Sequence, residues 1–193
     1  PATDCQGSLQ MFTYQPRGVV QALIATLLRT SLKLLLKPVF SPRWSIAFQR
    51  RWLGWIARVT LLAPNVYTEA AQAGGVAGEW LRRRHAPAVR PGAVLYLHGG
   101  GYCFSSAEAH RPLTWRLSRA ARRPVLAINY RQGPDHGIDH AREDALRAYE
   151  HLLDRGYAPG NILIGGDSAG GHLTLVTLQA LREAGLPMPR AGM

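Results

Sequence analysis

The chain has 193 residues, of which 47% are apolar and 18% are charged. This composition is that of a globular protein, and it excludes collagen-like, coiled-coil and wholly disordered chains. The two cysteines, Cys5 and Cys103, are too few for a disulfide framework. The formal net charge is +11, and residues 1–90 carry 12 basic and 3 acidic side chains. Because the basic stretches are short and no nucleic-acid motif accompanies them, we expect no nucleic-acid partner.

The most apolar stretch of the chain runs from Val19 to Leu36. Arg29 and Lys33 interrupt it, so it lacks the uncharged run of about 18 residues that a transmembrane helix needs. Its leucines recur at helical spacing and predict an amphipathic helix. Packing of the apolar face on the same protein is the favoured interpretation, and weak contact with a membrane surface is the alternative. We expect a cytoplasmic protein.

Residues 19–62 are predicted to be helical and to be broken into two pieces by Pro38 and Pro42. In the second piece, four aromatic side chains are predicted to share one helical face, either in a core or along a pocket: Trp44, Phe48, Trp52 and Trp55. A break at residues 63–65 ends this region. The sequence thus predicts an N-terminal helical region, residues 1–63, followed by a second domain, residues 64–193.

After residue 64 the pattern changes to short strands that alternate with helices. Strands are predicted at residues 66–68, 76–81, 93–97, 124–129 and 161–165, and helices at residues 107–121, 139–155 and 168–184. This alternation predicts an α/β fold with a mostly parallel sheet and flanking helices. Ligands of such folds gather at the carboxyl ends of the strands, so the turns at that edge are the candidates for a functional site.

One candidate turn lies between the strand at 161–165 and the helix at 168–184. Residues 166–170 read Gly-Asp-Ser-Ala-Gly, the G-x-S-x-G pattern in a strand–turn–helix context. Glycines in this turn let strand and helix pass close together and force Ser168 to the tip. The helix N-terminus offers unpaired N–H groups, and that of Ala169 is the natural donor to an oxyanion. The pattern favours a nucleophile elbow over a glycine-rich turn that binds nothing or holds a phosphate.

A second glycine-rich turn follows the strand at 93–97, where residues 98–101 read His-Gly-Gly-Gly. Consecutive glycines leave main-chain N–H groups free to converge on a small anion, and loops of this type complete oxyanion holes. We expect His98 to be structural and to fix the loop with its ring, because the general base of this fold follows the serine along the chain. His110, His140 and His151 are predicted to lie on helix surfaces.

The two motifs, in this order and with one predicted strand between them, make the chain resemble the hormone-sensitive lipase family of α/β-hydrolases over about residues 64–190. The resemblance implies an α/β-hydrolase fold, partial here, with the N-terminal helices as a cap over an acyl pocket. It also implies Ser168 as the nucleophile and three main-chain donors to the oxyanion, those of Gly100, Gly101 and Ala169.

The remaining motif residues are assigned to the support of this site. They are His98, Gly99, Gly166, Asp167 and Gly170. In one place the chain departs from the family pattern, because residues 132–135 read Gln-Gly-Pro-Asp. This departure leaves Asp135 as a stand-in for the acidic residue that the family usually has there.

A catalytic triad cannot be completed from these residues. In this fold the acid and the histidine follow the serine, and after Ser168 the sequence holds only His172 and Glu183. His172 lies four residues along the same helix, so we expect its side chain not to reach back to the serine hydroxyl. By resemblance a complete family member continues further, so the chain is interpreted as an incomplete hydrolase that ends at Met193.

The predicted function is that of a serine carboxylic-ester hydrolase of the esterase or lipase type. It would act on a small-molecule ester through an acyl-enzyme on Ser168, without a metal or an organic cofactor. The 193-residue chain alone is expected to be inactive. The alternative is a non-catalytic protein of the same fold that binds a small ligand, and a late histidine in the full coding sequence discriminates between the two.

Overall fold

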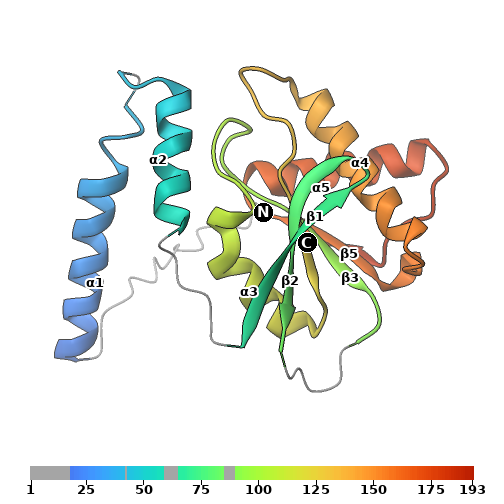
Figure 1. The fold of residues 1–193 in the computed structure, drawn as a ribbon, viewed down its shortest axis with the longest axis horizontal. Helices are drawn as coiled ribbons and strands as arrows, with labels where there is room; N and C mark the ends of the chain where they lie inside the picture. Colours follow the sequence, from blue (N-terminus) through green and yellow to red (C-terminus); the bar gives the residue numbers. More distant parts are fainter. Residues whose placement is uncertain (1–17, 42, 59–64, 85–89) are drawn as a thin grey trace, which may run out of the picture. The chain divides into compact units, whose positions relative to one another are not determined.

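The computed structural model describes residues 18–41, 43–58, 65–84 and 90–193 (Figure 1). The chain forms two compact units, Pro1–Trp44 and Ser45–Met193. Pro42 and the predicted domain boundary at residues 63–64 lie outside the described residues. The division of the chain at residue 64 therefore stays a prediction, whereas the second predicted helix packs within the second unit.

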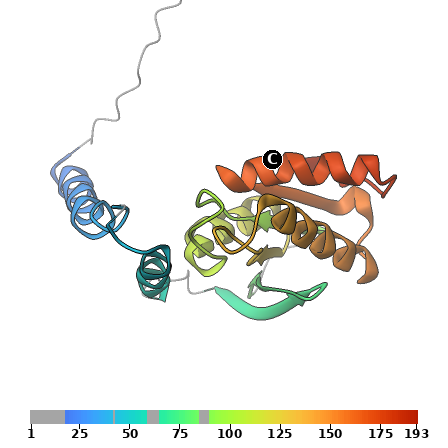
Figure 2. The same cartoon turned by 90° about the horizontal axis from the view of Figure 1, so that it is seen from above.

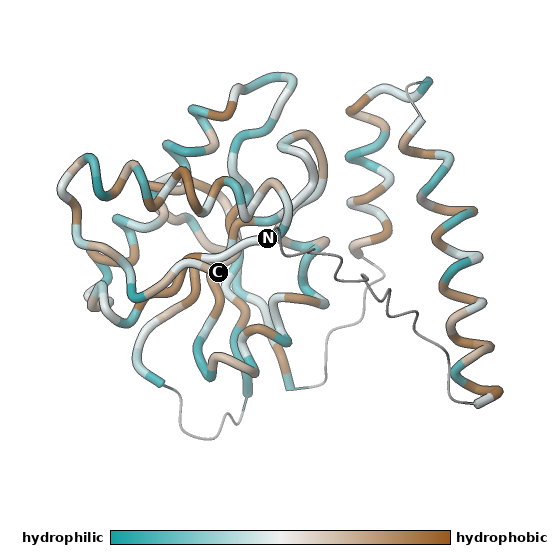
Figure 3. Tube along the Cα trace, turned by 180° about the vertical axis from the view of Figure 1, so that it is seen from behind, coloured by the Kyte–Doolittle hydropathy of each residue, from teal (hydrophilic) through white to brown (hydrophobic). Residues whose placement is uncertain are grey.

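The first unit contains the helix α1 (Val19–Ser31), which continues into a π-helical turn, η1 (Leu32–Leu36). The amphipathic helix predicted from the leucine spacing is therefore present. No residue of α1 is buried, and apolar and polar residues alternate along it (Figure 3). Within the described ranges, no helix combines the length and the hydropathy that a membrane-spanning segment requires.

The second unit begins with the helix α2 (Ile46–Arg58) and then forms a sheet, which has six strands in the described part of the chain. The strand order is β1-β2-β4-β3-β5-β6. β2 pairs antiparallel with β1 and β4, whereas β4, β3, β5 and β6 run parallel, so the mostly parallel sheet is confirmed. The strands are β1 (Val66–Ala73), β2 (Val76–Arg83), β3 (Ala93–Leu97), β4 (Val125–Ile128), β5 (Ile162–Gly166) and β6 (Ala191–Gly192).

Three details differ from the prediction. The strands β1 and β2 are longer than predicted, because Gly74 and Gly75, with φ angles of 60° and 84°, close a tight turn that lets the hairpin pair along its whole length. The helix predicted from residue 107 starts as a 3₁₀ turn, η2 (Glu108–His110). β6 has only two residues, too few for a periodic signal. The remaining helices are η2 (Glu108–His110), α3 (Arg111–Ala121), α4 (Ile138–Asp154), η3 (Pro159–Asn161) and α5 (Ala169–Glu183).

Helices cover both faces of the sheet (Figure 2). The central strand β3 shows the two layers, because successive side chains of a strand point to opposite faces. Ala93, Leu95 and Leu97 belong to the core under α4 and α5, and Val94 and Tyr96 belong to the core under α3. All five residues are buried, which explains why this strand is a continuous apolar run.

The core predicts how single substitutions act on stability. Leu126 lies in β4 with no exposed surface, so Leu126→Ala is expected to lower the free energy of unfolding by about 2–5 kcal/mol. Leu175 on α5 is 67% exposed, so Leu175→Ala is expected to change the free energy of unfolding by less than about 0.5 kcal/mol. Urea denaturation followed by circular dichroism measures both. Equal effects of the two variants would contradict the described core.

Candidate active site

The turn between β5 and α5 holds Ser168 at an exposed position. Its backbone angles are φ 51° and ψ −117°, a conformation that costs a residue with a Cβ atom about 1–3 kcal/mol. Among the described residues, the Ser168 hydroxyl has no hydrogen-bond partner. Such strain persists only where the surrounding structure imposes it, and a strained serine on a strand-to-helix turn is typical of a nucleophile elbow.

Gly166 and Gly170 mark the place where the strand and the helix cross. A Cβ atom on either glycine would overlap the carbonyl oxygen of Leu97 at the end of β3. On Gly166 it would also lie 2.6 Å from the Gly170 carbonyl carbon. Any side chain at these positions would push the turn away from β3. The two glycines therefore allow Ser168 to lie beside the carboxyl end of the neighbouring strand.

The His-Gly-Gly-Gly loop leaves β3, which pairs directly with β5. Gly100 and Gly101 have φ angles of 122° and 60°, and the Gly100 carbonyl oxygen accepts hydrogen bonds from the amides of Cys103 and Phe104 at 3.1 and 2.9 Å. These bonds close the loop into a compact turn. In the part of the chain that is described, the main-chain N–H groups of residues 100, 101 and 169 have no acceptor. They are thus available to a ligand.

Asp167 joins the two turns. Its Oδ1 atom accepts a hydrogen bond from the Gly99 amide at 2.9 Å and another from the Tyr96 hydroxyl at 2.6 Å. The Nε2 atom of His110 lies 3.3 Å from the same oxygen. A Cβ atom on Gly99 would overlap the Asp167 carboxylate, so this approach requires a glycine. Two residues predicted only as support for the site are therefore in direct contact.

A second contact links the turns on their other side. The Tyr102 hydroxyl lies 2.8 Å from Nδ1 of His172, and the two rings meet edge to face. Along the chain, residues 100–101 and residues 168–169 thus lie between the contact of Gly99 with Asp167 and that of Tyr102 with His172. The glycine-rich loop and the serine turn are held next to each other in this way. As expected, the His172 ring is directed to a partner other than Ser168.

His98 lies buried beneath this arrangement. Its Nδ1 atom is 2.9 Å from the Gly99 carbonyl oxygen, so the proton on Nδ1 is donated to that oxygen. Its ring stacks on that of Tyr130 at a centroid distance of 4.4 Å, and the Tyr130 hydroxyl donates to the His98 carbonyl oxygen at 2.6 Å. Burial lowers the pKa of His98 to about 4, so the ring is neutral at physiological pH. These contacts agree with the structural role expected for His98.

The prediction that His110 lies on a helix surface is wrong. Its side chain is only 16% exposed, and its ring stacks on that of His98 at 5.6 Å. The reason is local, because residues 108–110 form η2 and not the first turn of a regular helix. This turn directs the ring of His110 toward Asp167. No periodic pattern reveals such a contact between residues far apart in the chain.

Arg50 of α2 is a second residue that sequence reasoning missed. Its guanidinium donates to the Cys103 carbonyl oxygen at 2.8 Å and to the Gly133 carbonyl oxygen, and it pairs with Asp135 at 3.1 Å. One side chain therefore connects α2 both to the glycine-rich loop and to residues 133–135. In this structure the Asp135 carboxylate is engaged by Arg50. In the sequence Arg50 showed only as part of a short basic stretch.

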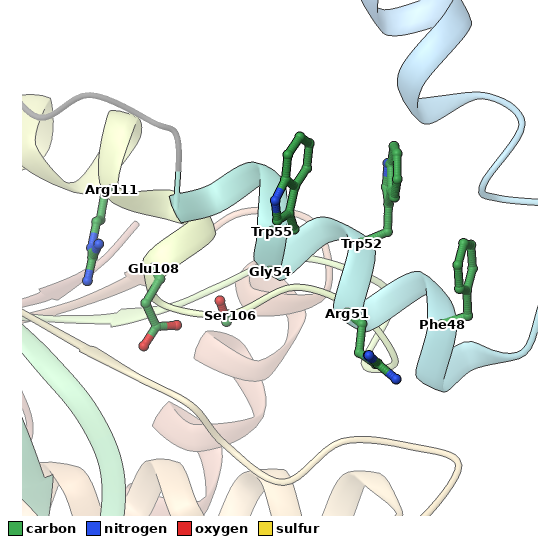
Figure 4. Close-up of a pocket in the computed structure, with 8 residues that line it drawn as sticks. All are labelled: Phe48, Arg51, Trp52, Gly54, Trp55, Ser106, Glu108 and Arg111. Atoms are coloured by element: carbon green, nitrogen blue, oxygen red, sulfur yellow. The ribbon is translucent and has the colours of Figure 1, made fainter.

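A cavity of about 980 Å³ lies between α2 and the residues that follow the glycine-rich loop (Figure 4). The rings of Phe48, Trp52 and Trp55 lie along one side of α2, with centroid distances of 6.4 and 5.7 Å between successive rings. The predicted aromatic face thus lines a pocket from Phe48 onward, whereas Trp44 precedes α2. Within the described ranges, no group of three or more His, Cys, Asp and Glu side chains is arranged to hold a metal ion.

The mostly parallel sheet and the strained serine turn beside a glycine-rich loop define an α/β-hydrolase. A family profile described as the α/β-hydrolase fold matches residues 94–193, the part of the chain that carries both turns. An acetyl-hydrolase from Streptomyces hygroscopicus is 45% identical over 121 residues, which cover 62% of this chain and 39% of that protein.

Two crystal structures resemble the described fold at 35% and 36% identity. The first is an esterase/lipase from an uncultured bacterium; it has a TM-score of 0.76, and the match covers 88% of this chain and 56% of that chain. The second is an esterase from the bacterial hormone-sensitive lipase family; it has a TM-score of 0.75, and the match covers 86% of this chain and 55% of that chain. The chain belongs to the hormone-sensitive lipase family of α/β-hydrolases, as the two motifs predict. It spans about two fifths of the length of the curated relatives it matches first.

The crossing of strand and helix predicts opposite effects for two adjacent glycines. Gly170→Ala places a methyl group on the Leu97 carbonyl oxygen, and we expect the free energy of unfolding to fall by about 1–3 kcal/mol. Gly171→Ala places its methyl group 3.4 Å from the Gly166 carbonyl oxygen. Because alanine favours the helix more than glycine does, we expect the free energy of unfolding to rise by up to about 1 kcal/mol. Urea denaturation compares the two. A tolerated Gly170→Ala would show that the crossing is looser than described.

Asp167 predicts a pH-dependent contribution to stability. Burial alone would raise its pKa, but the hydrogen bond from Tyr96, the nearby His110 ring and the Gly99 amide hold it below the usual value. A carboxylate with a lowered pKa stabilises the folded state above its ordinary pKa of about 3.9, and this contribution is lost as the pH falls through the lowered value. Asp167→Asn should therefore lower the free energy of unfolding at neutral pH, with the difference from wild type shrinking below about pH 4. A difference that stays constant in acid, measured by urea denaturation, would refute this assignment.

Proposed function

We propose that this chain carries the nucleophile and the oxyanion-binding part of a serine carboxylic-ester hydrolase. The observation that supports this most directly is the unpaired hydroxyl of Ser168, held on a strained turn beside main-chain N–H groups without acceptors. The relative named acetyl-hydrolase and the esterase neighbours support a small-molecule ester as the substrate. Esters with a short or medium acyl chain are the proposed class.

In the proposed reaction, the Ser168 oxygen attacks the ester carbonyl carbon while a general base takes its proton. The carbonyl oxygen becomes an oxyanion and accepts hydrogen bonds from the main chain of Gly100, Gly101 and Ala169, of which one donor can contribute about 3–4 kcal/mol. The intermediate collapses, and the alcohol leaves with the proton from the base. Water, deprotonated by the same base, then attacks the acyl-enzyme, releases the carboxylic acid and restores the serine.

The general base is proposed to come from outside these 193 residues. Three histidines lie near the turn, but each has another partner: His172 meets Tyr102, His110 meets Asp167, and His98 is buried against Gly99. Among the described residues, none of them is hydrogen-bonded to the Ser168 hydroxyl. The reaction therefore needs a histidine, oriented by an acidic residue, that reaches the turn from another segment.

The aromatic cavity is proposed to receive the apolar part of the ester. It is lined by Phe48, Trp52 and Trp55, and α2 is joined to the glycine-rich loop through Arg50. The same cavity also suits the alternative function, a non-catalytic protein that binds a small ligand. The chemistry at Ser168 separates these two functions, because a binding protein needs no activated hydroxyl.

The test uses the full-length protein and a fluorophosphonate probe, which labels an activated serine. We expect labelling that Ser168→Ala abolishes and that Ser45→Ala, at the serine directly before α2, leaves intact. Hydrolysis of p-nitrophenyl acetate should fall by about 10³-fold or more in Ser168→Ala. The 193-residue chain alone should react only at a background rate.

Each outcome has a distinct meaning. If the full-length protein is folded by circular dichroism and is not labelled, the esterase proposal is wrong and the binding function is favoured. If the 193-residue chain alone is labelled rapidly at Ser168, the base lies within these residues, and its assignment to another segment is wrong.

A further inference from the structure

A basic pocket lies at the end of the sheet opposite Ser168. It is a cavity of about 360 Å³, lined by residues at the amino ends of β3 and β4 and at the carboxyl end of β2. Ser168, in contrast, follows the carboxyl end of β5, which is parallel to β3. A volume of this size lies at the lower end of the range for small-molecule sites. We call it the arginine pocket after its lining residues Arg82, Arg83, Arg90, Arg122 and Arg123.

The positive charge of the arginine pocket is largely uncompensated. Arg82 pairs with Glu69 at 2.8 Å. The other four arginines have no carboxylate within 4 Å in the part of the chain that is described, and no acidic residue lines the cavity. Like charges gathered without a counter-charge repel one another and oppose folding. An anion in the cavity would remove this repulsion.

Arg123 gives the pocket a fixed cation. The residue is only 9% exposed, and its Nε atom donates to the Pro91 carbonyl oxygen at 3.0 Å. The Ser118 hydroxyl donates to the Arg123 carbonyl oxygen at 2.7 Å, which holds the main chain at this point. Among the described residues, the terminal nitrogens of Arg123 have no acceptor. Burial and the neighbouring charges of Arg190 and Arg90 lower the pKa of its guanidinium, as expected where no counter-charge is present.

We propose that the arginine pocket binds the phosphate group of a small, soluble ligand. Guanidinium groups match phosphate oxygens with paired hydrogen bonds, and a dianion compensates several cations better than a monocarboxylate does. Tyr67 and Tyr157 also line the cavity and offer aromatic surface to the organic part of such a ligand. Because the pocket lies at the other end of the sheet, its ligand stabilises the fold without competing with an ester at Ser168.

Thermal unfolding of the protein tests this proposal, with inorganic phosphate as the probe and sodium chloride at matched ionic strength as the reference. Phosphate is expected to raise Tm above the chloride value in a saturable way, as a ligand of the folded state does. Arg83→Gln and Arg122→Gln should each weaken the apparent phosphate affinity about tenfold or more, because each removes a charged hydrogen-bond donor. Arg182→Gln removes one charge from an exposed position on α5 and serves as the matched control, with an unchanged affinity.

The other outcomes overturn the proposal. Equal Tm shifts in phosphate and in chloride, or equal Tm shifts by phosphate in all variants, would show general screening of charge. An equal shift with acetate would show that the pocket does not select a phosphate group. Soluble phosphate could also leave Tm unchanged while phosphatidylglycerol vesicles bind the protein. If Arg83→Gln abolished that vesicle binding, the pocket would be assigned to a lipid headgroup. Circular dichroism verifies that the variants are folded, and the result is independent of any reaction at Ser168.

Discussion

A single carboxylate oxygen, Oδ1 of Asp167, sets the relation between the two glycine-rich turns. It accepts hydrogen bonds from the Gly99 amide and the Tyr96 hydroxyl, and bonds to an ionised acceptor are about twice as strong as neutral ones. Asp167 directly precedes Ser168, and Gly99 directly precedes Gly100. The same oxygen therefore fixes the position of the serine turn and that of the loop whose N–H groups have no acceptor among the described residues. The contact between Tyr102 and His172 adds a second link between the same two turns.

The rest of the structure keeps this link in place. β3 is buried on both faces and lies beside β5, so the two turns leave adjacent, rigid strands. Glycines at 166 and 170 allow the close approach to Leu97, and the strained backbone of Ser168 lies between these two glycines in the chain. On the outer side, Arg50 connects α2 to the loop at Cys103. Rigid strands and these contacts therefore hold the two turns in fixed positions.

The two ends of the sheet differ in electrostatic character. At the carboxyl ends of the parallel strands, the partial positive charge comes from main-chain N–H groups and a helix N-terminus. Guanidinium charges occur at both ends, but Arg50 near the glycine-rich loop pairs with Asp135, whereas most of those at the opposite end lack a carboxylate partner among the described residues. The latter belong to segments far apart in the chain: β2, the residues just before β3 and the turn after α3. Arg82, Arg83 and Arg90, which contribute to the excess positive charge of residues 1–90, line the same cavity as Arg122 and Arg123. A count of charges along the sequence does not reveal that convergence.

The sequence by itself determined the alternation of strands and helices and the positions of the two glycine-rich turns. These features depend on local backbone requirements and on the periodicity of apolar residues, both of which short segments express. Only the tertiary structure decided that His110 faces Asp167, that Arg50 binds the loop at Cys103, and that β6 joins the sheet. Such contacts connect residues far apart along the chain, and their energies depend on burial and distance, which no local pattern records.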